Sequence, residues 1–355
     1  MKSKFGKSAI ALTASTLVGF TALPAQSALL VSSSSDNSIK QYDENTGAYI
    51  RDFVTSGSGG LLNPQGLTLG ANGNLFVSSS GTNSLKEYSG TSGAYIRDLV
   101  SPSGGILAPQ GLTSADDGSL FVVTGRIPGT ERDAGIGMGL VTFDSGVVQY
   151  DIDTGAIIKS INTGTSSLGA VFPTGPQPID VAIGGPDNNL FLSLRSARFN
   201  SGGINEYDPD TGNLLRGLPL RETFLSPGNI AVGDRDLFYT EFATIGRIDL
   251  ATGLADRDFI SDNELNGATG ITIGANGNLF VSDSTNNSVK QYDGETGNFL
   301  GDFISSGSGG LSSPTYLTTA NVPVPEPSSV LGVLALGGLF AGGAVRRKRI
   351  AKLQK

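Results

Sequence analysis

The sequence predicts an all-β protein, a six-bladed β-propeller closed by its C-terminal strand, and three observations lead to this prediction. A unit best seen at 63–100 returns along nearly the whole chain with a period of roughly 40 to 50 residues, which is typical of propellers and arrays. Its copies share a Leu-Phe-Val type triplet and an Asp-x-x-Thr-Gly turn. One extra copy of the unit's first strand stands at 313–318, far from the other strands of any unit.

The unit at 63–100 contains short strand-like runs separated by turn residues, at Gln65–Leu69, Asn74–Ser78, Ser84–Tyr88 and Tyr95–Val100. The pair Asn72-Gly73 predicts a two-residue type I′ hairpin between the first two runs, because both residues tolerate positive φ. One four-stranded sheet cannot bury both of its faces alone. We therefore expect the copies to pack face to face around an axis.

The copies can be counted from their triplets and turns. The triplet returns at Leu30-Val31, Leu120-Phe121-Val122, Leu190-Phe191-Leu192, Leu237-Phe238-Tyr239 and Leu279-Phe280-Val281. The turn stands at Asp43–Gly47, Asp151–Gly155, Asp208–Gly212, Asp249–Gly253 and Asp293–Gly297. These copies predict six blades. The segment SPTYLT at 313–318 matches NPQGLT at 63–68, so we expect it to complete blade one and close the ring, which protects the sheet edges.

The first 28 residues have the parts of a secretory signal peptide. Three lysines precede an apolar run at 9–23, and the small residues that follow suit cleavage by signal peptidase near Ser27 or Ala28. We thus expect three segments: a signal at 1–28, the propeller at 29–320 and a C-terminal tail at 321–355. The chain has no cysteine, so its stability must come from packed blades rather than disulfides.

The charge of the expected exported domain excludes some partners. The chain has a formal net charge of −8, from 24 basic and 32 acidic residues. Leaving out the nine basic residues of the signal and tail, together with Glu326, gives the propeller about −16. Such a charge keeps the domain soluble and argues against binding to nucleic acid or to anionic membrane surfaces.

The tail changes composition abruptly. Val322–Pro327 is a proline-rich spacer, and Ser328–Val345 follows as an uncharged run just long enough to span a thin bilayer as a helix. The basic cluster after it is expected to stay in the cytoplasm: Arg346, Arg347, Lys348 and Arg349. The precursor would then be anchored in the inner membrane with its propeller outside the cell.

The order of these elements closely resembles a PEP-CTERM sorting signal, with Pro325-Glu326-Pro327 as its motif. The resemblance implies that an exosortase-type enzyme removes the tail and that the protein reaches the cell surface or extracellular matrix of a bacterium that produces exopolysaccharide. A plain C-terminal membrane anchor is the alternative interpretation. It explains the helix and the arginines but not the Pro-Glu-Pro motif.

The repeat elements also resemble a family of propellers. Pro-x-Gly-Leu-Thr, Asn-Gly-Asn-Leu-Phe-Val-Ser and Asn-Ser-Val-Lys-Gln-Tyr-Asp are similar to NHL repeats and their relatives in the SMP-30/gluconolactonase and virginiamycin B lyase superfamily. The resemblance spans about 29–320 and implies the fold but not the activity. Lyase activity of the virginiamycin type depends on histidine, which this chain lacks. Gluconolactonase-like relatives hold a divalent cation such as calcium in the central channel with Glu, Asn and Asp.

Asp180 is the one carboxylate predicted on a first strand, and therefore the one candidate ligand for such a cation. The positions matched to it in the other blades are Thr68, Thr113, Ala231, Thr272 and Thr318. A hard cation needs several oxygen ligands, so one carboxylate is too few. A hydrogen-bonded structural aspartate is the favoured alternative.

Three lengthened loops are expected on one face, at Gly125–Ser145, Thr163–Gln177 and Arg195–Gly203. Long loops in a compact domain often carry function. These loops hold a candidate ligand-binding set for a carboxylated or sulfated sugar: Arg126, Arg132, Arg195, Arg198, Phe199 and Asn200. Local ion pairs with Glu131 and Asp133 are the equally weighted alternative.

These observations predict an exported surface or matrix protein that acts as a non-catalytic binding or scaffold module, with exopolysaccharide as the expected ligand. The absence of histidine removes the commonest general base and the commonest metal ligand, which weighs against an enzyme. The alternative is a metal-dependent hydrolase of the gluconolactonase type that works in the central channel around Asp180.

Overall fold

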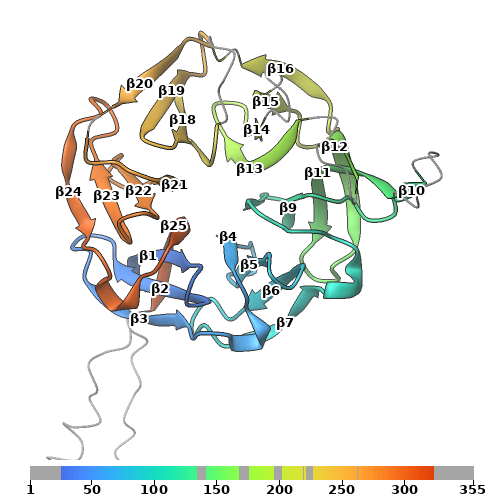
Figure 1. Cartoon of the computed structure of the whole chain (residues 1–355), viewed down its shortest axis with the longest axis horizontal. Coiled ribbons are helices and arrows are strands. Elements are labelled where there is room, and N and C mark those ends of the chain that lie inside the picture. Colours follow the sequence, from blue (N-terminus) through green and yellow to red (C-terminus); the bar gives the residue numbers. More distant parts are fainter. Residues whose placement is uncertain are drawn as a thin grey trace, which may run out of the picture. The chain divides into compact units, whose positions relative to one another are not determined.

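The structure, a computed structural model, describes residues 25–133, 141–167, 176–195, 202–218, 220, 227–261 and 263–323. Its strands form six antiparallel sheets that stand as blades around a central axis (Figure 1). The described residues contain no α-helix, only three short 3-10 turns: η1 (Ser58–Gly60), η2 (Pro102–Gly104) and η3 (Ser308–Gly310). The predicted six-bladed propeller is confirmed, and Gln26–Val322 forms one compact unit.

In each blade the first-named strand lies nearest the axis and the others follow outward. Blade one consists of β25 (Pro314–Pro323), β1 (Ala25–Ser33), β2 (Ser38–Asp43) and β3 (Tyr49–Val54). Blade two consists of β4 (Pro64–Leu69), β5 (Leu75–Ser79), β6 (Ser84–Tyr88) and β7 (Tyr95–Val100). Blade three consists of β8 (Leu112–Ser114), β9 (Ser119–Thr124), β11 (Val141–Asp151) and β12 (Ile157–Ser167), with the short β10 (Arg132–Asp133) paired to β11. The strands of blade two begin and end within one residue of their predicted bounds.

The other three blades follow the same order. Blade four consists of β13 (Gln177–Gly184), β14 (Asn189–Arg195), β15 (Gly203–Tyr207) and β16 (Leu214–Leu218). Blade five consists of β17 (Ile230–Val232), β18 (Asp236–Glu241), β19 (Thr244–Asp249) and β20 (Ala255–Ile260). Blade six consists of β21 (Ala268–Ile273), β22 (Leu279–Asp283), β23 (Ser288–Tyr292) and β24 (Phe299–Ile304).

Blade one is closed by the two ends of the propeller. Its sheet has the order β25-β1-β2-β3, so the C-terminal strand supplies the innermost position, as predicted. Ala320 and Val322 of β25 are buried in the same cluster as Ala28 and Leu30 of β1. The sheet therefore extends past both predicted borders of the domain, since β1 begins at Ala25 rather than Leu29 and β25 ends at Pro323.

The hydrophobic core lies between neighbouring blades. It divides into six clusters of buried residues. Each cluster includes a buried aliphatic residue of a first strand: Leu67, Leu112, Val181, Ile271, Leu317 and Ile230, respectively. Removing such an aliphatic side chain from water contributes about 1.5–3 kcal/mol. Because side chains alternate along a strand, the next residue of each first strand faces the axis.

The hairpin between β4 and β5 corrects one prediction. Gly73 has a φ of 74°, but Asn72 is not among the described residues with positive φ, so the turn is not of type I′. The Gly70 N–H donates to the Asn74 carbonyl (2.9 Å) and the Gly73 N–H donates to the Gly70 carbonyl (2.8 Å). The connection is thus longer than two residues and fits a type I turn followed by a glycine bulge, which needs positive φ only at the glycine.

The structure of blade three corrects the prediction of long loops in this blade. The segments predicted as the loops 125–145 and 163–177 are partly strand, because β11 and β12 pair from Thr142 with Ser167 down to Tyr150 with Ile157. The β-branched and aromatic residues of Val141–Phe143 favour this extension over a loop. Residues 134–140, 168–175 and 196–201 of the predicted loops lie outside the described residues.

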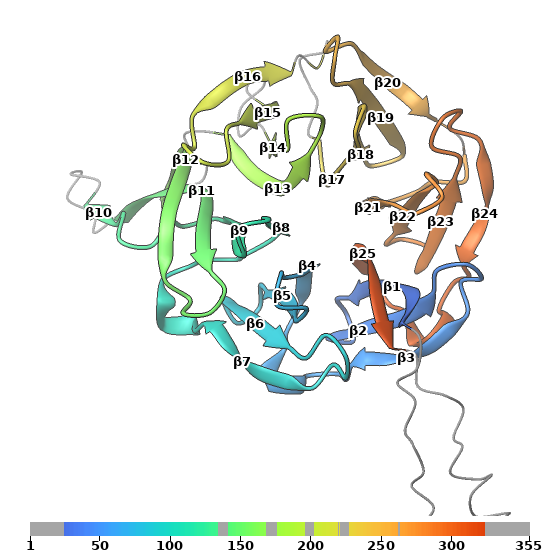
Figure 2. The same cartoon turned by 180° about the vertical axis from the view of Figure 1, so that it is seen from behind.

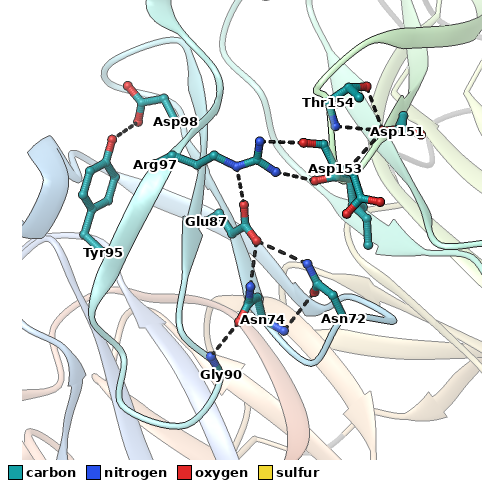
Figure 3. A network of polar contacts seen from close by, with 11 residues as sticks. Asn72, Asn74, Glu87, Gly90, Tyr95, Arg97, Asp98, Asp151, Asp153 and Thr154 are labelled. Carbon is teal, nitrogen blue, oxygen red and sulfur yellow. Dashed lines mark hydrogen bonds and ion pairs between the residues drawn. The ribbon is translucent and has the colours of Figure 1, made fainter.

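Basic side chains hydrogen-bond from one blade to the next, and Figure 3 shows one of them, Arg97. Arg97 of β7 bonds Glu87 of β6 through Nε (2.6 Å), and its other nitrogens donate to the carbonyls of Ile152 and Asp153 in blade three (2.6 Å each). Four other basic side chains also donate a hydrogen bond to a backbone carbonyl in the turn of the next blade: Arg51, Lys159, Arg216 and Arg247. Charge-assisted bonds of this kind are stronger than neutral ones.

Candidate functional site

The candidate site is a cavity of about 210 Å3 on the propeller axis. It is surrounded by the six innermost strands, which ring the centre in Figures 1 and 2: β4, β8, β13, β17, β21 and β25. In each strand the residue after the buried core residue faces this cavity. Four of these six residues are threonines: Thr68, Thr113, Thr272 and Thr318, with Ala182 and Ala231 at the other two places.

The strand register corrects the predicted place of Asp180. Thr68 pairs with Phe76 and Thr272 pairs with Phe280, and in blade four the partner of the equivalent Phe191 is Ala182. Asp180 stands two residues earlier, so it is not level with the threonines, and the predicted match was wrong. The inserted residues before blade four change the spacing between the repeats. The first strand of blade four therefore cannot be aligned with the other first strands by counting residues.

The residues at the level of Asp180 form a layer that we call the channel floor. Around the ring, from blade one to blade six, this layer consists of Tyr316, Gly66, Gly111, Asp180, Asn229 and Gly270. The glycines are needed because the first strands approach each other closely here. A Cβ on Gly111 would lie 1.9 Å from Asp180 Oδ1, and one on Gly270 would lie 2.3 Å from the Thr315 carbonyl oxygen. The first strands are therefore packed closely at the floor, and the side chains at this level come from Asp180, Asn229 and Tyr316.

Asp180 is held by backbone N–H groups of two blades. It is 5% exposed, and its two carboxylate oxygens accept hydrogen bonds from the N–H groups of Val181 and Ile230, both at 2.9 Å. Loss of water around the buried carboxyl raises its pKa to about 7, although the bonds from Ile230 and Val181 lower it. Asp180 thus ties blade four to blade five, which is the structural role favoured from sequence.

Tyr316 reaches across the channel from the opposite blade. Its hydroxyl donates to the carbonyl oxygen of Ile179 at 3.1 Å. Burial first, and then the charge of Asp180, raise the pKa of this hydroxyl well above its ordinary value, while the charge of Arg195 lowers it. Tyr316 is only partly buried because it also lines the cavity. Its side chain is the largest group of the floor.

Hydrogen bonds between successive blades form a closed hoop around the axis. From blade one onward the donors and acceptors are Thr315 Oγ1 to Pro64 O, Gly66 N to Gln110 O, Gly111 N to Ile179 O, Ile230 N to Asp180 Oδ2, Thr240 Oγ1 to Thr269 O and Thr269 Oγ1 to Pro314 O. Each donor and acceptor lies at or beside the floor. The hoop fixes the spacing of the blades where the cavity ends.

The predicted arginine site is assembled only in part by the described residues. Arg126 Nε donates to the Gly105 carbonyl (2.6 Å) and lies 3.6 Å from Glu131 Oε1, so Arg126 makes the local contacts of the alternative interpretation. Arg195 ends β14 and is exposed. The backbone of Arg132 belongs to β10, but its side chain lies outside the described residues, as do Arg198, Phe199 and Asn200 entirely.

The floor does not fit the metal site that gluconolactonase-like relatives suggest. Both oxygens of Asp180 face N–H donors, which occupy directions that a cation would need. Three of the six floor positions are glycine and offer no side-chain oxygen. Across the described ranges, no group of three or more His, Cys, Asp or Glu residues is arranged to hold a metal ion.

Two floor residues were missed from sequence, although a signal for them existed. Asn229 and Tyr316 stand where the repeat Pro-x-Gly-Leu-Thr has glycine, as does Asp180. Asn229 is 7% exposed, and its Nδ2 has no hydrogen-bond partner in the described part of the chain. A departure from glycine at a crowded repeat position is therefore the sequence feature that marks all three side chains of the floor.

Comparison with known proteins supports the assignment of the C-terminal tail as a sorting signal and the assignment of the fold as a propeller. Residues 323–349 match the PEP-CTERM protein-sorting motif, so the chain carries a C-terminal sorting signal that indicates an exported protein processed by an exosortase-type system. This range includes Pro325, Glu326, Pro327 and the basic cluster Arg346–Arg349, all outside the described residues. The predicted membrane segment at 328–345 also lies outside the described residues. Within the described residues, no helix is long and apolar enough to cross a membrane.

The propeller is similar in fold to several solved structures. A chain of a nidogen/laminin complex has a TM-score of 0.60 and 14% identity, covering 83% of this chain and 98% of that one. A streptogramin B lyase has a TM-score of 0.55 and 17% identity, covering 84% and 88%. A Bacteroides caccae protein of unknown function has a TM-score of 0.56 and 14% identity, covering 83% and 99%. No curated protein matches the sequence. Identities this low carry the fold alone.

Proposed function

We propose that this chain is an exported β-propeller that the PEP-CTERM tail directs to the cell surface or extracellular matrix, where it binds polysaccharide without catalysis. The observation that carries the proposal is the combination of a sorting motif at 323–349 with a propeller whose channel floor is committed to structure. An axial cavity remains open beside that floor. Such a cavity in a rigid ring is suited to binding.

The chemistry of the floor favours binding over hydrolysis. A hydrolase of the gluconolactonase type would need a cation or a general base that reaches the substrate. Asp180 is the one carboxylate among the described residues that line the cavity, and both of its oxygens already accept hydrogen bonds from the backbone. Replacing water at a metal site requires several converging oxygen ligands, and glycine occupies the flanking places.

The proposal is tested with the exported protein and polysaccharide purified from the same extracellular matrix. Co-sedimentation at increasing polysaccharide concentration should show saturable retention of the protein, and the polymer should keep its length after long incubation. Failure to co-sediment with any matrix fraction would refute the binding role. Cation-dependent opening of a lactone, lost in a folded Asp180→Asn variant, would establish the hydrolase instead.

A further inference from the structure

The residues that line the axial cavity begin at the floor and continue from it in one direction. Its lining continues along the first strands from Asp180 and Tyr316 to residues such as Val232 and Ile273, which lead into the β17–β18 and β21–β22 hairpins. These first hairpins stand on the face opposite the lengthened segments of blades three and four. The lining thus points to that tight-turned face as the entrance, and not to the face where sequence placed the binding residues.

The wall of the cavity has a polar and an apolar side. Thr272, Thr318, Thr68 and Thr113 come from blades six, one, two and three, which are consecutive around the ring. We call this set the threonine arc. Ala182 and Ala231 complete the circle from blades four and five. The hydroxyls of Thr68, Thr113 and Thr272 have no hydrogen-bond partner in the described ranges. Three uncommitted hydroxyls therefore face two methyl groups across a narrow space.

Charge excludes an anionic occupant. Among the described residues, no lysine, arginine or histidine lines the cavity, and the ionisable groups of its lining are Asp180 and Tyr316. The hairpins around its entrance add exposed acidic and amide side chains: Asn72, Asp116, Asp117, Asp187, Asp234 and Asn276, against one exposed Arg235. A carboxylate or sulfate entering here would lose its water and meet like charge, which is costly. The occupant must be uncharged or cationic.

We propose that the cavity binds one uncharged sugar residue through the threonine arc, with the apolar C–H face of the ring against Ala182 and Ala231. The proposal rests on the proposed binding function and names its site and ligand class. A volume of about 210 Å3 is many times the roughly 10–15 Å3 that a cavity needs to hold one water molecule, so it has room for a small cyclic molecule. A sugar pairs hydroxyl edges with apolar faces, as this wall does.

The first test measures binding of neutral monosaccharides and short neutral oligosaccharides to the exported protein by calorimetry and ligand-observed NMR. The double variant Thr68→Val/Thr272→Val keeps the side-chain volume and removes two hydroxyls, so affinity should fall by about tenfold or more. Ala182→Leu fills the apolar side and should abolish binding. The control Thr55→Val changes an exposed threonine away from the cavity and should leave affinity unchanged.

The same titrations with a uronic acid and with matrix polysaccharide separate the outcomes. Weaker binding of the uronic acid than of its neutral counterpart supports the charge argument, and tighter binding overturns it. If the cavity variants bind both the free sugar and the polysaccharide more weakly than wild type, the inference is supported, and the cavity binds the sugar residue at the end of a polysaccharide chain. If polysaccharide binding persists unchanged in folded cavity variants, the inference is wrong while the proposed function stands. If wild-type protein binds no polysaccharide, the proposed function itself fails.

Discussion

The hydroxyl of Tyr316 lies 3.1 Å from the carbonyl oxygen of Ile179 and hydrogen-bonds to it, so the strand that closes blade one also touches blade four across the axis. Blades one and four face each other in the ring (Figure 1). The contact therefore does two things at once. It holds the C-terminal strand β25 in place and sets the Tyr316 side chain across the channel at the floor.

Removing that hydroxyl should cost stability without opening the floor. In Tyr316→Phe the aromatic side chain remains, but the Ile179 carbonyl loses one hydrogen-bond donor. The free energy of unfolding should therefore fall by about 1 kcal/mol. Tyr316→Ala should cost more, because it also leaves a gap between the glycines of the neighbouring strands. Urea unfolding followed by circular dichroism measures both. Equal stability of all three proteins would show that the bridge across the axis contributes nothing.

The buried carboxyl of Asp180 should make stability depend on pH. Its pKa is about 7 in the folded state and near 3.8 when unfolded, so the fold favours the protonated form. Its stabilising contribution is complete below about pH 4 and is lost as pH rises through 7, by about 3 to 4 kcal/mol. Asp180→Asn cannot ionise, so its free energy of unfolding should change much less over this range.

A matched control for the pH experiment is Asp208→Asn. The N–H groups of Thr211 and Asp210 lower the pKa of Asp208, so its contribution is present at neutral pH and is lost as pH falls. This substitution should alter the acid limb of the stability profile and leave the limb between pH 4 and 7 intact. A wild-type profile that is flat from pH 4 to 7 would contradict the assignment to Asp180.

The outer contact of Arg97 should bind blade two to blade three. Glu87 is nearly buried at 4% side-chain exposure, and it also accepts hydrogen bonds from Asn72 and Asn74 (Figure 3). Arg97→Ala removes the cation and three hydrogen bonds, and since Arg97 itself is 39% exposed we expect a loss of about 1–2 kcal/mol. A double-mutant cycle with Glu87→Gln, read by chemical unfolding, isolates the pair. A coupling energy indistinguishable from zero would remove this contact from the account.

The sorting motif should be required for processing. Replacing Pro325, Glu326 and Pro327 with alanine should leave an uncleaved precursor in the membrane fraction, because the apolar segment after them would act as a stop-transfer anchor. Cell fractionation and mass spectrometry of the C-terminus measure this. Replacing Ser328 and Ser329 with alanine is the control and should leave cleavage intact. Normal release of the triple variant would rule out exosortase-type processing at this motif.

The fold was largely readable from sequence because repeats amplify a weak signal. One copy of Leu75-Phe76-Val77 is an ambiguous strand, but repeated copies at similar spacing leave few architectures, and the spare strand at 313–318 revealed how the ring closes. The site was harder to predict. Asp180 was identified as a channel residue, yet its level in the channel depends on strand pairing, which sequence spacing does not determine across an insert.

Tyr316 shows why contacts between residues far apart in the sequence could not be predicted. Its function in the floor depends on meeting the Ile179 carbonyl, which lies 137 residues away in sequence and comes close only once the ring has closed. The sequence predicts loops for the lengthened segments of blade three because its periodicity is weak near 141–167, where pairing between β11 and β12 decides the structure. Contacts that exist only after closure cannot be found in local patterns.

The most direct test of the central claim is the salt dependence of polysaccharide binding, measured with wild type and with Arg195→Glu. If an uncharged sugar residue occupies the axial cavity, the isotherms at low and at moderate salt should coincide, and the substitution at the exposed Arg195 should leave them unchanged. If arginines on the opposite face grip an anionic polymer, affinity should fall steeply with salt, because screening lengths shrink below about 10 Å above 0.1 M, and the variant should bind more weakly. Coincident curves are the result we predict, and a salt-sensitive interaction lost in Arg195→Glu would contradict it.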